Sequence, residues 1–281
     1  MQPANFDYQR ANSIEEAESL CKANADASFL AGGHSLIPAM KLRLSEPGTL
    51  VDISGIDDLK GISRDGDTIR IGALTTHNEV ESSDVVNENC VVLAEAAGKI
   101  GDPQVRNRGT IGGNVAHADP ASDYPGILMA LGATVVTSSR SIAVDDFFTG
   151  LFETALNEGE VIKEIQVPAL SEGSGAAYAK FFNPASRYAV VGIGAVVTMD
   201  NGSCSSCSIG VTGAASHAFR ASAAEDVLTR SDLGEDAITA AAAKVAEGKE
   251  MLSDLSASAN YRIHLCSVMA KRAIAEAASR A

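Results

Sequence analysis

The spacing of apolar residues predicts that the chain begins with a small unit of alternating helices and strands. Ser13 and Glu16 have the spacing of a capping box, which predicts a helix from Ser13 to about Ala23. Short apolar runs typical of buried strands follow this helix. The other expected elements of this unit are a strand at residues 28–31, a helix starting at residue 36 and a strand at residues 49–53.

The same pattern predicts a second unit between about residues 56 and 169. Residues 68–73 alternate between polar and apolar positions like a half-buried strand, and residues 89–100 carry an apolar face at helical spacing. Strands near residues 133–137 and 161–167 complete the unit. Residues 171–175 then have the Ser- and Gly-rich composition of a linker.

The last third of the chain is predicted to contain a sheet followed by helices. Asp200-Asn201-Gly202 is a strong hairpin signal between two long apolar runs. The expected strands cover residues 177–182, 188–199 and 204–212. Alanine-rich helices are expected at residues 222–229, 235–249 and 258–280.

Two glycine pairs, within Ala31-Gly32-Gly33-His34-Ser35 and Thr110-Ile111-Gly112-Gly113-Asn114, are the main candidates for a binding site. Without Cβ atoms, backbone amides can approach a bulky anionic group closely. The helix expected after the first pair, with Pro38 in its first turn, would aim free N–H groups back at the turn. Each pair alone indicates only a tight turn. One ligand with a diphosphate would explain both.

Composition narrows the possible partners and the compartment. A net charge of −14 argues against a nucleic-acid partner, because it would repel a phosphate backbone. No segment has the roughly 18 apolar residues of a membrane helix, and the N-terminus lacks the pattern of a signal peptide, so we expect a cytoplasmic location. The five cysteines form no disulfide framework, and Cys204 and Cys207 lack further metal ligands nearby. We therefore expect no metal site in this chain.

Other common site motifs are incomplete. Gly192 and Gly194 match the first two glycines of a dinucleotide fingerprint, but Val197 stands at the third position and the segment resembles a strand interior. The GxSxG motif of serine hydrolases is absent, and the five histidines are scattered. We therefore expect neither an NAD site nor catalytic residues.

Residues 28–44 and 108–114 resemble the two FAD-binding segments of the medium, flavoprotein subunit of molybdenum hydroxylases. This family includes xanthine dehydrogenase and aerobic carbon monoxide dehydrogenase, and the resemblance covers nearly the whole chain. It implies an α+β fold of the vanillyl-alcohol-oxidase type. Two α/β subdomains, residues 1–55 and 56–170, would hold FAD, and residues 176–281 would form a C-terminal domain with a three-stranded antiparallel sheet and helices.

The resemblance also implies which residues bind FAD. The two glycine segments would enclose the diphosphate, and Asp123 corresponds to an aspartate that binds FAD, through ribose hydroxyls in our interpretation. Lys180 and Tyr188 correspond to positions close to the isoalloxazine ring, and Ile162 to a residue that packs against the flavin. Without the resemblance, each residue also has a structural interpretation: Asp123 as a loop or helix-capping acid, Lys180 as a surface lysine, Tyr188 as a core tyrosine and Ile162 as a buried strand residue.

His34 leaves two ways of holding the flavin open. Many medium subunits have glutamine at this position, whereas the carbon monoxide dehydrogenase type has Gly-Gly-His-Ser, as this chain does. Another branch of FAD enzymes with this fold also has Gly-Gly-His-Ser and attaches its flavin covalently through the histidine. Residues 36–43 resemble the carbon monoxide dehydrogenase type, so we expect non-covalent FAD with His34 as a hydrogen-bonding neighbour.

The function implied by the resemblance is electron transfer within a larger complex, with carbon monoxide dehydrogenase as the first expectation. Iron–sulfur clusters on a small subunit would supply electrons, a quinone or similar external acceptor would take them, and a large subunit would carry the molybdenum cofactor, in a dimer of heterotrimers. This chain has too few cysteines to hold such clusters itself. The alternatives are the medium subunit of a xanthine, aldehyde or N-heterocycle hydroxylase, or a stand-alone flavin oxidase.

Overall fold

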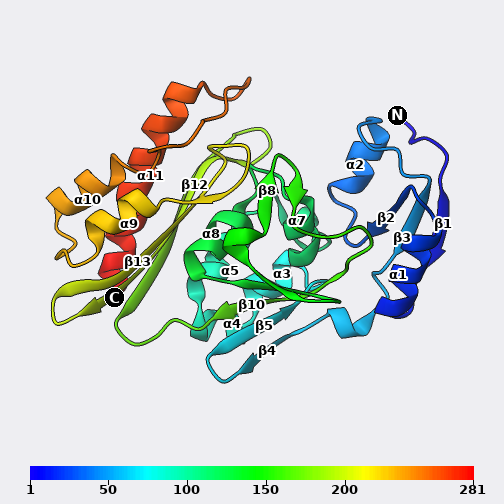
Figure 1. Ribbon diagram of the computed structural model, residues 1–281, viewed down its shortest axis with the longest axis horizontal. Helices are drawn as coiled ribbons and strands as arrows, with labels where there is room; N and C mark the ends of the chain where they lie inside the picture. The colour runs from blue at the N-terminus through cyan, green and yellow to red at the C-terminus, as the bar shows by residue number, and fades with distance from the viewer.

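Three main sheets of different topology follow one another along the chain in the computed structural model, which describes residues 1–281. A fourth, two-stranded sheet is formed by Phe148–Gly150 and Glu153–Thr154. Figure 1 shows the N-terminal unit at the right, the middle segment at the centre and the C-terminal sheet with its helices at the left. No helix is both long and apolar enough to cross a bilayer.

The N-terminal unit is a three-stranded parallel sheet in the order β1-β3-β2. Its elements are β1 (Asp7–Arg10), α1 (Ile14–Ala23), β2 (Ala27–Leu30), α2 (Leu36–Lys41) and β3 (Thr49–Asp52). The expected cap of α1 is present in part. The Glu16 N–H donates to the Ser13 hydroxyl, but the Glu16 carboxylate accepts the N–H of Asn12 rather than that of Ser13.

The middle segment is a five-stranded sheet in the order β4-β5-β10-β6-β7, covered by helices. The helix expected at 89–100 is present as Val91–Gly98, and its start is set by the non-helical backbone of Cys90, which separates it from an additional helix at Asp84–Asn89. The elements are β4 (Ile62–Asp65), β5 (Thr68–Gly72), α3 (His77–Ser82), α4 (Asp84–Asn89), α5 (Val91–Gly98), α6 (Pro103–Arg106), α7 (Ile111–His117), α8 (Asp123–Leu131), β6 (Thr134–Thr137), β7 (Ser141–Ala143), β8 (Phe148–Gly150), β9 (Glu153–Thr154) and β10 (Ile162–Pro168).

The C-terminal sheet is antiparallel, in the order β11-β12-β13-β14. The three expected strands are present, and a two-residue fourth strand, which the sequence did not indicate, pairs with β13. Asn201 and Gly202 have φ values of +50° and +79°, which close the predicted hairpin. The elements are β11 (Ser174–Phe182), β12 (Ala189–Asp200), β13 (Ser203–Thr212), β14 (Phe219–Arg220), α9 (Ser222–Leu228), α10 (Glu235–Ala242) and α11 (Ala259–Arg280).

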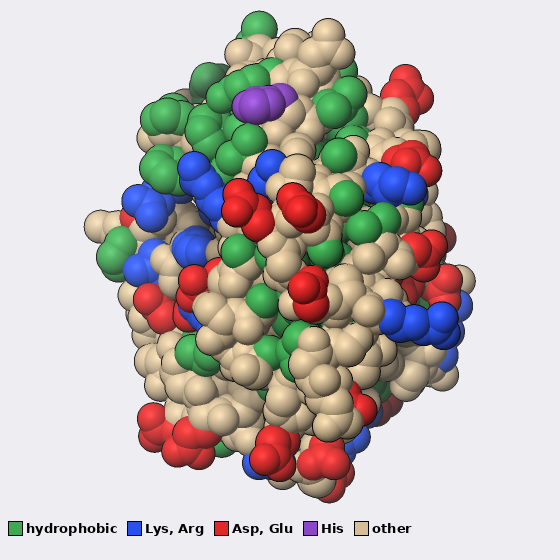
Figure 2. Space-filling model, turned by 90° about the vertical axis from the view of Figure 1, so that its left-hand side faces the viewer, with side chains coloured by type: hydrophobic (Ala, Val, Ile, Leu, Met, Phe, Trp, Pro, Cys, Tyr) green, Lys and Arg blue, Asp and Glu red, His purple; other side chains and the backbone are tan.

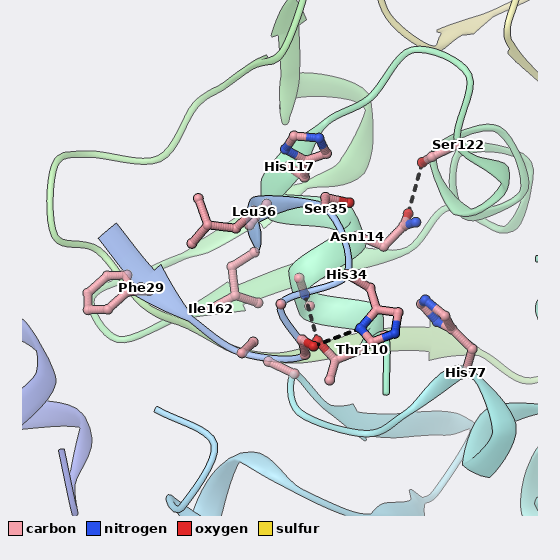
Figure 3. Close-up of a pocket in the computed structure, with 18 of the residues that line it drawn as sticks. Phe29, His34, Ser35, Leu36, His77, Thr110, Asn114, His117, Ser122 and Ile162 are labelled. Carbon is pink, nitrogen blue, oxygen red and sulfur yellow. Dashed lines mark hydrogen bonds between the residues drawn. The ribbon is translucent and has the colours of Figure 1, made fainter. Parts of the chain in front are cut away.

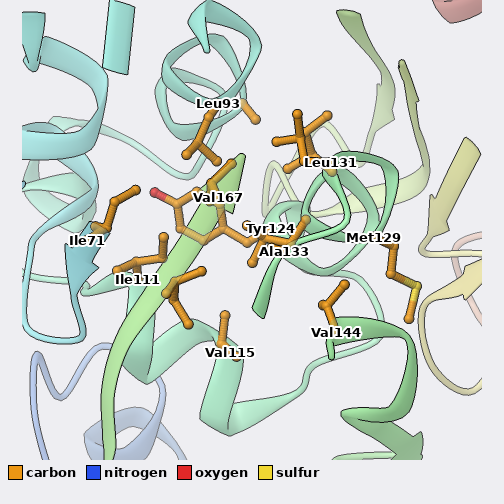
Figure 4. Packing of buried hydrophobic residues seen from close by; sticks show 14 of the residues in the cluster. Ile71, Leu93, Ile111, Val115, Tyr124, Met129, Leu131, Ala133, Val144 and Val167 are labelled. Atoms are coloured by element: carbon orange, nitrogen blue, oxygen red, sulfur yellow. The ribbon is translucent and has the colours of Figure 1, made fainter. Parts of the chain in front are cut away.

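Helix α8 joins the middle segment to the C-terminal sheet. All its residues are buried, since one side packs in the core of the middle segment and the other packs on β12 and β13. Figure 4 shows Tyr124 of this helix surrounded by apolar side chains of the middle segment. Glycines permit the contact with the sheet: a Cβ at Gly210 would collide with the carbonyl oxygen of Gly126. The first residue of α8, Asp123, is thereby held between both parts.

Candidate functional site

A cavity of about 550 Å³ lies between the N-terminal unit and the middle segment, and three residues of the C-terminal part, Ser186 to Tyr188, complete its wall. This volume is in the range of roughly 300–1,000 Å³ that small-molecule and cofactor sites occupy. Figure 3 shows the loop of His34, Ser35 and Leu36 beside α7 with Thr110 at its start. The two glycine segments therefore meet at one site, as the sequence predicts.

The glycines were expected to make room for a ligand, but most of them make room for other parts of the protein. A Cβ at Gly32 would collide with the carbonyl oxygen of Arg108, and a Cβ at Gly112 would lie 2.5 Å from the Cβ of Ala73. Gly33 has φ +70°, which favours glycine whatever the space around it. The glycines thus allow protein segments to approach each other, which closes the cavity, rather than simply clearing space for a ligand.

The two glycine segments differ in the backbone donors that they offer. The N–H groups of residues 32–36 take part in no hydrogen bond within the chain. In the second segment the backbone N–H groups are already used. Those of Ile111 and Gly112 donate to the carbonyls of Thr75 and Ala73. The N–H of Gly113 donates to the Thr110 hydroxyl. Consecutive free amides in a loop are suited to an anion. The first segment therefore has the free donors that an anion requires, whereas the donors of the second segment are used within the protein.

Side chains add further polar groups along the second segment. The Asn114 side-chain oxygen accepts the Ser122 hydroxyl at 2.9 Å, which leaves its amide N–H groups without a partner in the chain. Figure 3 shows this pair on the side of the cavity formed by α7. Asn114 can therefore donate to a ligand, while Thr110 is used as the N-cap of α7.

Two histidines lie beside the glycine loop. The Nδ1 of His34 is 3.0 Å from the carbonyl oxygen of Gly32. Burial, with smaller effects of His34 and Arg106, lowers the pKa of His77 to about 4, so this ring is neutral near pH 7. The Nδ1 of His77 is buried without a hydrogen-bond partner. Figure 3 shows the two rings close to each other.

Asp123 is a buried carboxylate in the cavity wall, held by two residues of β11. The Tyr178 hydroxyl donates to its Oδ1 at 2.6 Å, and the Lys180 ammonium donates to its Oδ2 at 2.8 Å. Burial raises the pKa of Asp123, while Lys180 and Tyr178 oppose that rise. Burial lowers the pKa of Lys180, because it disfavours the charged form of the amine as well. This carboxylate can accept a further hydrogen bond from a ligand.

Twelve of the fourteen predicted site residues line the cavity, all except Ile111 and Lys180. The Ile111 side chain is fully buried in the core, where Figure 4 shows it near Tyr124. Lys180 lies behind Asp123 and not in the cavity wall. Tyr188 lies in the loop before β12, rather than on the strand.

Sequence reasoning did not select several residues that line the cavity. His77 follows Thr76, whose hydroxyl and Glu79 form a complete capping box for α3, so a helix-start signal marked its position. Glu160 and Arg187 belong to no motif. The other residues that the prediction omitted include Phe29, Leu36, His117 and Ser122.

The residues present fit a long cofactor with an anionic middle, such as FAD. The free amides of residues 32–36 suit a diphosphate, and the Asp123 carboxylate suits a hydroxyl or N–H donor. Aliphatic and aromatic side chains, among them Ile162 and Tyr188, provide surfaces for flat rings.

Comparisons with known proteins agree with this fit. Residues 4–170 match the family described as the FAD binding domain in molybdopterin dehydrogenase, and residues 176–277 match the CO dehydrogenase flavoprotein C-terminal domain. The 6-hydroxypseudooxynicotine dehydrogenase complex subunit alpha of Paenarthrobacter nicotinovorans is 40% identical over 100% of this chain and 97% of its own length. The carbon monoxide dehydrogenase medium chain of Hydrogenophaga pseudoflava is 39% identical, with 100% and 99% covered.

Solved structures give the same result and confirm the expected fold class. Carbon monoxide dehydrogenase from Hydrogenophaga pseudoflava that lacks the Mo-pyranopterin moiety of the molybdenum cofactor contains a chain that superposes with a TM-score of 0.97. The two chains are 41% identical, and the match covers 100% of this chain and 99% of the other. This chain therefore belongs to the FAD-binding medium subunits of molybdenum hydroxylases and is an oxidoreductase subunit.

Proposed function

We propose that this chain is the electron-transfer flavin subunit of a carbon monoxide dehydrogenase-type complex. It would take electrons from iron–sulfur clusters of a small subunit and pass them to an external acceptor such as a quinone, while a large molybdenum subunit oxidises the substrate. The observation that carries the proposal is the cavity, which has an anion-binding loop and flat-ring surfaces but no assembled set of nucleophile, base and orienting group.

In this proposal, specific groups of the chain hold the cofactor. Backbone N–H groups of residues 32–36, the Ser35 hydroxyl and the Asn114 amide donate to the diphosphate, which offsets the repulsion from an acidic protein. Asp123 accepts a hydroxyl or N–H, and Ile162 and Tyr188 cover ring surfaces. When bound, FAD supplies the conversion between one-electron and two-electron transfer.

An apolar surface at the start of α11 supports the proposal of partner subunits. Phe181 and Tyr261 meet edge to face with ring centroids 6.1 Å apart, and Leu255 and Ile263 nearby are also exposed. Figure 2 shows apolar side chains gathered near the top of the face on this side of the molecule. Exposed apolar patches of this kind often mark protein interfaces.

The dimer of heterotrimers, the cytoplasmic location and the domain division at 1–55, 56–170 and 176–281 are parts of the same proposal.

A second candidate differs only in the substrate of the complex. The relative from Paenarthrobacter nicotinovorans, whose name refers to 6-hydroxypseudooxynicotine, is as similar to this chain as the carbon monoxide dehydrogenase medium chain is. An N-heterocyclic substrate is therefore the alternative to carbon monoxide.

Purification of the tagged full chain together with its native partners tests both parts of the proposal. We expect one FAD per chain and co-purification of a small iron–sulfur subunit and a large molybdenum subunit. The complex should oxidise carbon monoxide with a quinone analogue as acceptor, and the isolated chain should not. Oxidation of N-heterocycles alone would favour the second candidate. Substrate turnover by the isolated chain would contradict the electron-transfer role.

A further inference from the structure

We propose that Tyr178 is a positioning residue of the cofactor site and that the C-terminal sheet takes part in cofactor binding through it. The proposal rests on the proposed role of the cavity as the FAD site. Tyr178 is 3% exposed and does not line the cavity. Its hydroxyl reaches the cavity only through the Asp123 carboxylate, at 2.6 Å. It thus acts through Asp123 rather than on the ligand.

Two glycines of β12 leave room for the Tyr178 hydroxyl and for α8. Gly192 of β12 pairs with Lys180 of β11, and a Cβ at Gly192 would collide with the Tyr178 hydroxyl oxygen. Gly194 pairs with Tyr178, and a Cβ there would lie 2.9 Å from the Ile127 side chain of α8. The two glycines therefore seat α8 on the sheet and place its first residue within reach of Tyr178.

A closed ring of hydrogen bonds keeps both donors in place. The Lys99 ammonium donates to the backbone carbonyl of Tyr178 at 2.6 Å, and the Lys99 carbonyl accepts the Lys180 ammonium at 3.0 Å. Neither donor to Asp123 can turn away without leaving a buried polar or charged group unpaired, which is costly. The Asp123 carboxylate is therefore fixed in one orientation before a ligand enters.

The two hydrogen bonds from Tyr178 and Lys180 leave acceptor positions on the Asp123 carboxylate unused. A carboxylate has about four lone-pair positions, of which Tyr178 and Lys180 use two. Other titratable groups near Asp123 are Lys99 after α5, Tyr124 on α8 and Tyr188 before β12, and none of these three bonds to it. The remaining acceptor positions suit a hydroxyl or N–H of the ligand, and FAD carries both.

The affinity of the full chain for FAD as a function of pH tests this role. In Tyr178→Phe, the loss of one charge-assisted hydrogen bond should weaken FAD binding by about tenfold. The midpoint at which binding is lost on acidification should also move to higher pH, because Asp123 loses one of the two donors that favour its charged form. Fluorescence titration of the flavin-free full chain with FAD between about pH 5 and 8 measures both quantities.

Tyr124→Phe is a matched control. Tyr124 is adjacent to Asp123 and fully buried, but its hydroxyl has no partner, so this variant should keep the wild-type affinity and midpoint. Gly192→Ala should reproduce the shift of Tyr178→Phe by displacing the hydroxyl. An unchanged midpoint in Tyr178→Phe, or the same loss in Tyr124→Phe, would overturn the positioning role while leaving FAD binding intact. Wild-type chain that binds no FAD would instead refute the proposed function and this inference with it.

Discussion

Two buried carboxylates line the same cavity, Glu160 and Asp123, and they differ in how completely the fold uses them. Glu160 accepts six hydrogen bonds, from the side chains of Thr137, Ser139, Arg140 and Asn157 and the backbone N–H of Asn157. Asp123 accepts two. A carboxylate with all its lone pairs used is a structural group, whereas one with acceptor capacity left can bind a ligand.

The pKa values follow the same difference. Although burial opposes its ionisation, the donors around Glu160, with Arg140 foremost, lower its pKa to about 2. Burial raises the pKa of Asp123, because this carboxyl is more deeply buried than Glu160 and its donors offset only part of the cost of desolvation. The two acids of this cavity therefore differ in two respects: Asp123 is the more deeply buried, and it accepts fewer hydrogen bonds.

The largest expected effect comes from removal of the Asp123 carboxylate. Asp123→Ala leaves the Lys180 ammonium buried without its counter-ion, so the free energy of unfolding should fall by about 3–5 kcal/mol. FAD binding should also be lost. Urea denaturation and the flavin content of the purified protein measure the two effects.

The double variant Asp123→Ala/Lys180→Met separates stability from binding. Removal of both charges should restore part of the stability, since no unpaired ammonium remains, but it should not restore FAD. If the double variant bound FAD with wild-type affinity, Asp123 would be a structural group like Glu160 and the comparison would fail.

A smaller effect, on stability alone, is expected for Glu160→Gln. The substitution removes the negative charge and turns the amide N–H groups of glutamine toward the donors around position 160. The free energy of unfolding should therefore fall by roughly 2–3 kcal/mol near pH 7. FAD affinity should stay within about threefold of wild type, because Glu160 has no acceptor capacity left for a ligand. Selective loss of FAD at unchanged stability would show that Glu160 binds the cofactor.

The pH dependence of the Glu160 effect has a definite sign. The pKa of Glu160 lies at about 2 in the folded chain, below its ordinary value of 4.5. The stabilisation is therefore complete above about pH 4.5 and is lost as the pH falls toward 2. The difference in unfolding free energy between wild type and Glu160→Gln should shrink over this interval.

The difference between these two acids shows how far the sequence could predict the site. The glycine pairs, the hairpin at Asn201-Gly202 and most elements follow from local signals, because turn and capping chemistry acts over a few residues. The position of Lys180 behind Asp123 depends on packing of α8 against the C-terminal sheet, because the two residues lie 57 positions apart in the chain. The Glu160 cluster likewise joins residues from 137 to 160 that belong to no motif. Such contacts arise from tertiary packing, which local patterns do not encode.

The smallest effect is expected at His34, which lines the cavity but is exposed and bonded only to its own loop. Its Nδ1 is close to the carbonyl oxygen of Gly32, and no group from another segment fixes the ring. A glutamine side chain can donate a similar hydrogen bond, so His34→Gln should retain FAD with an affinity reduced by less than about fivefold.

Acid precipitation of wild-type protein and His34→Gln distinguishes non-covalent from covalent FAD. A cavity that holds a cofactor through free amides and a fixed carboxylate requires no covalent bond, so all the yellow colour should remain in the supernatant in both cases. Flavin that stayed with the wild-type precipitate, and was released by His34→Gln, would instead identify His34 as the attachment point. The glycine loop, rather than Asp123, would then dominate cofactor retention, and Asp123→Ala should keep its flavin.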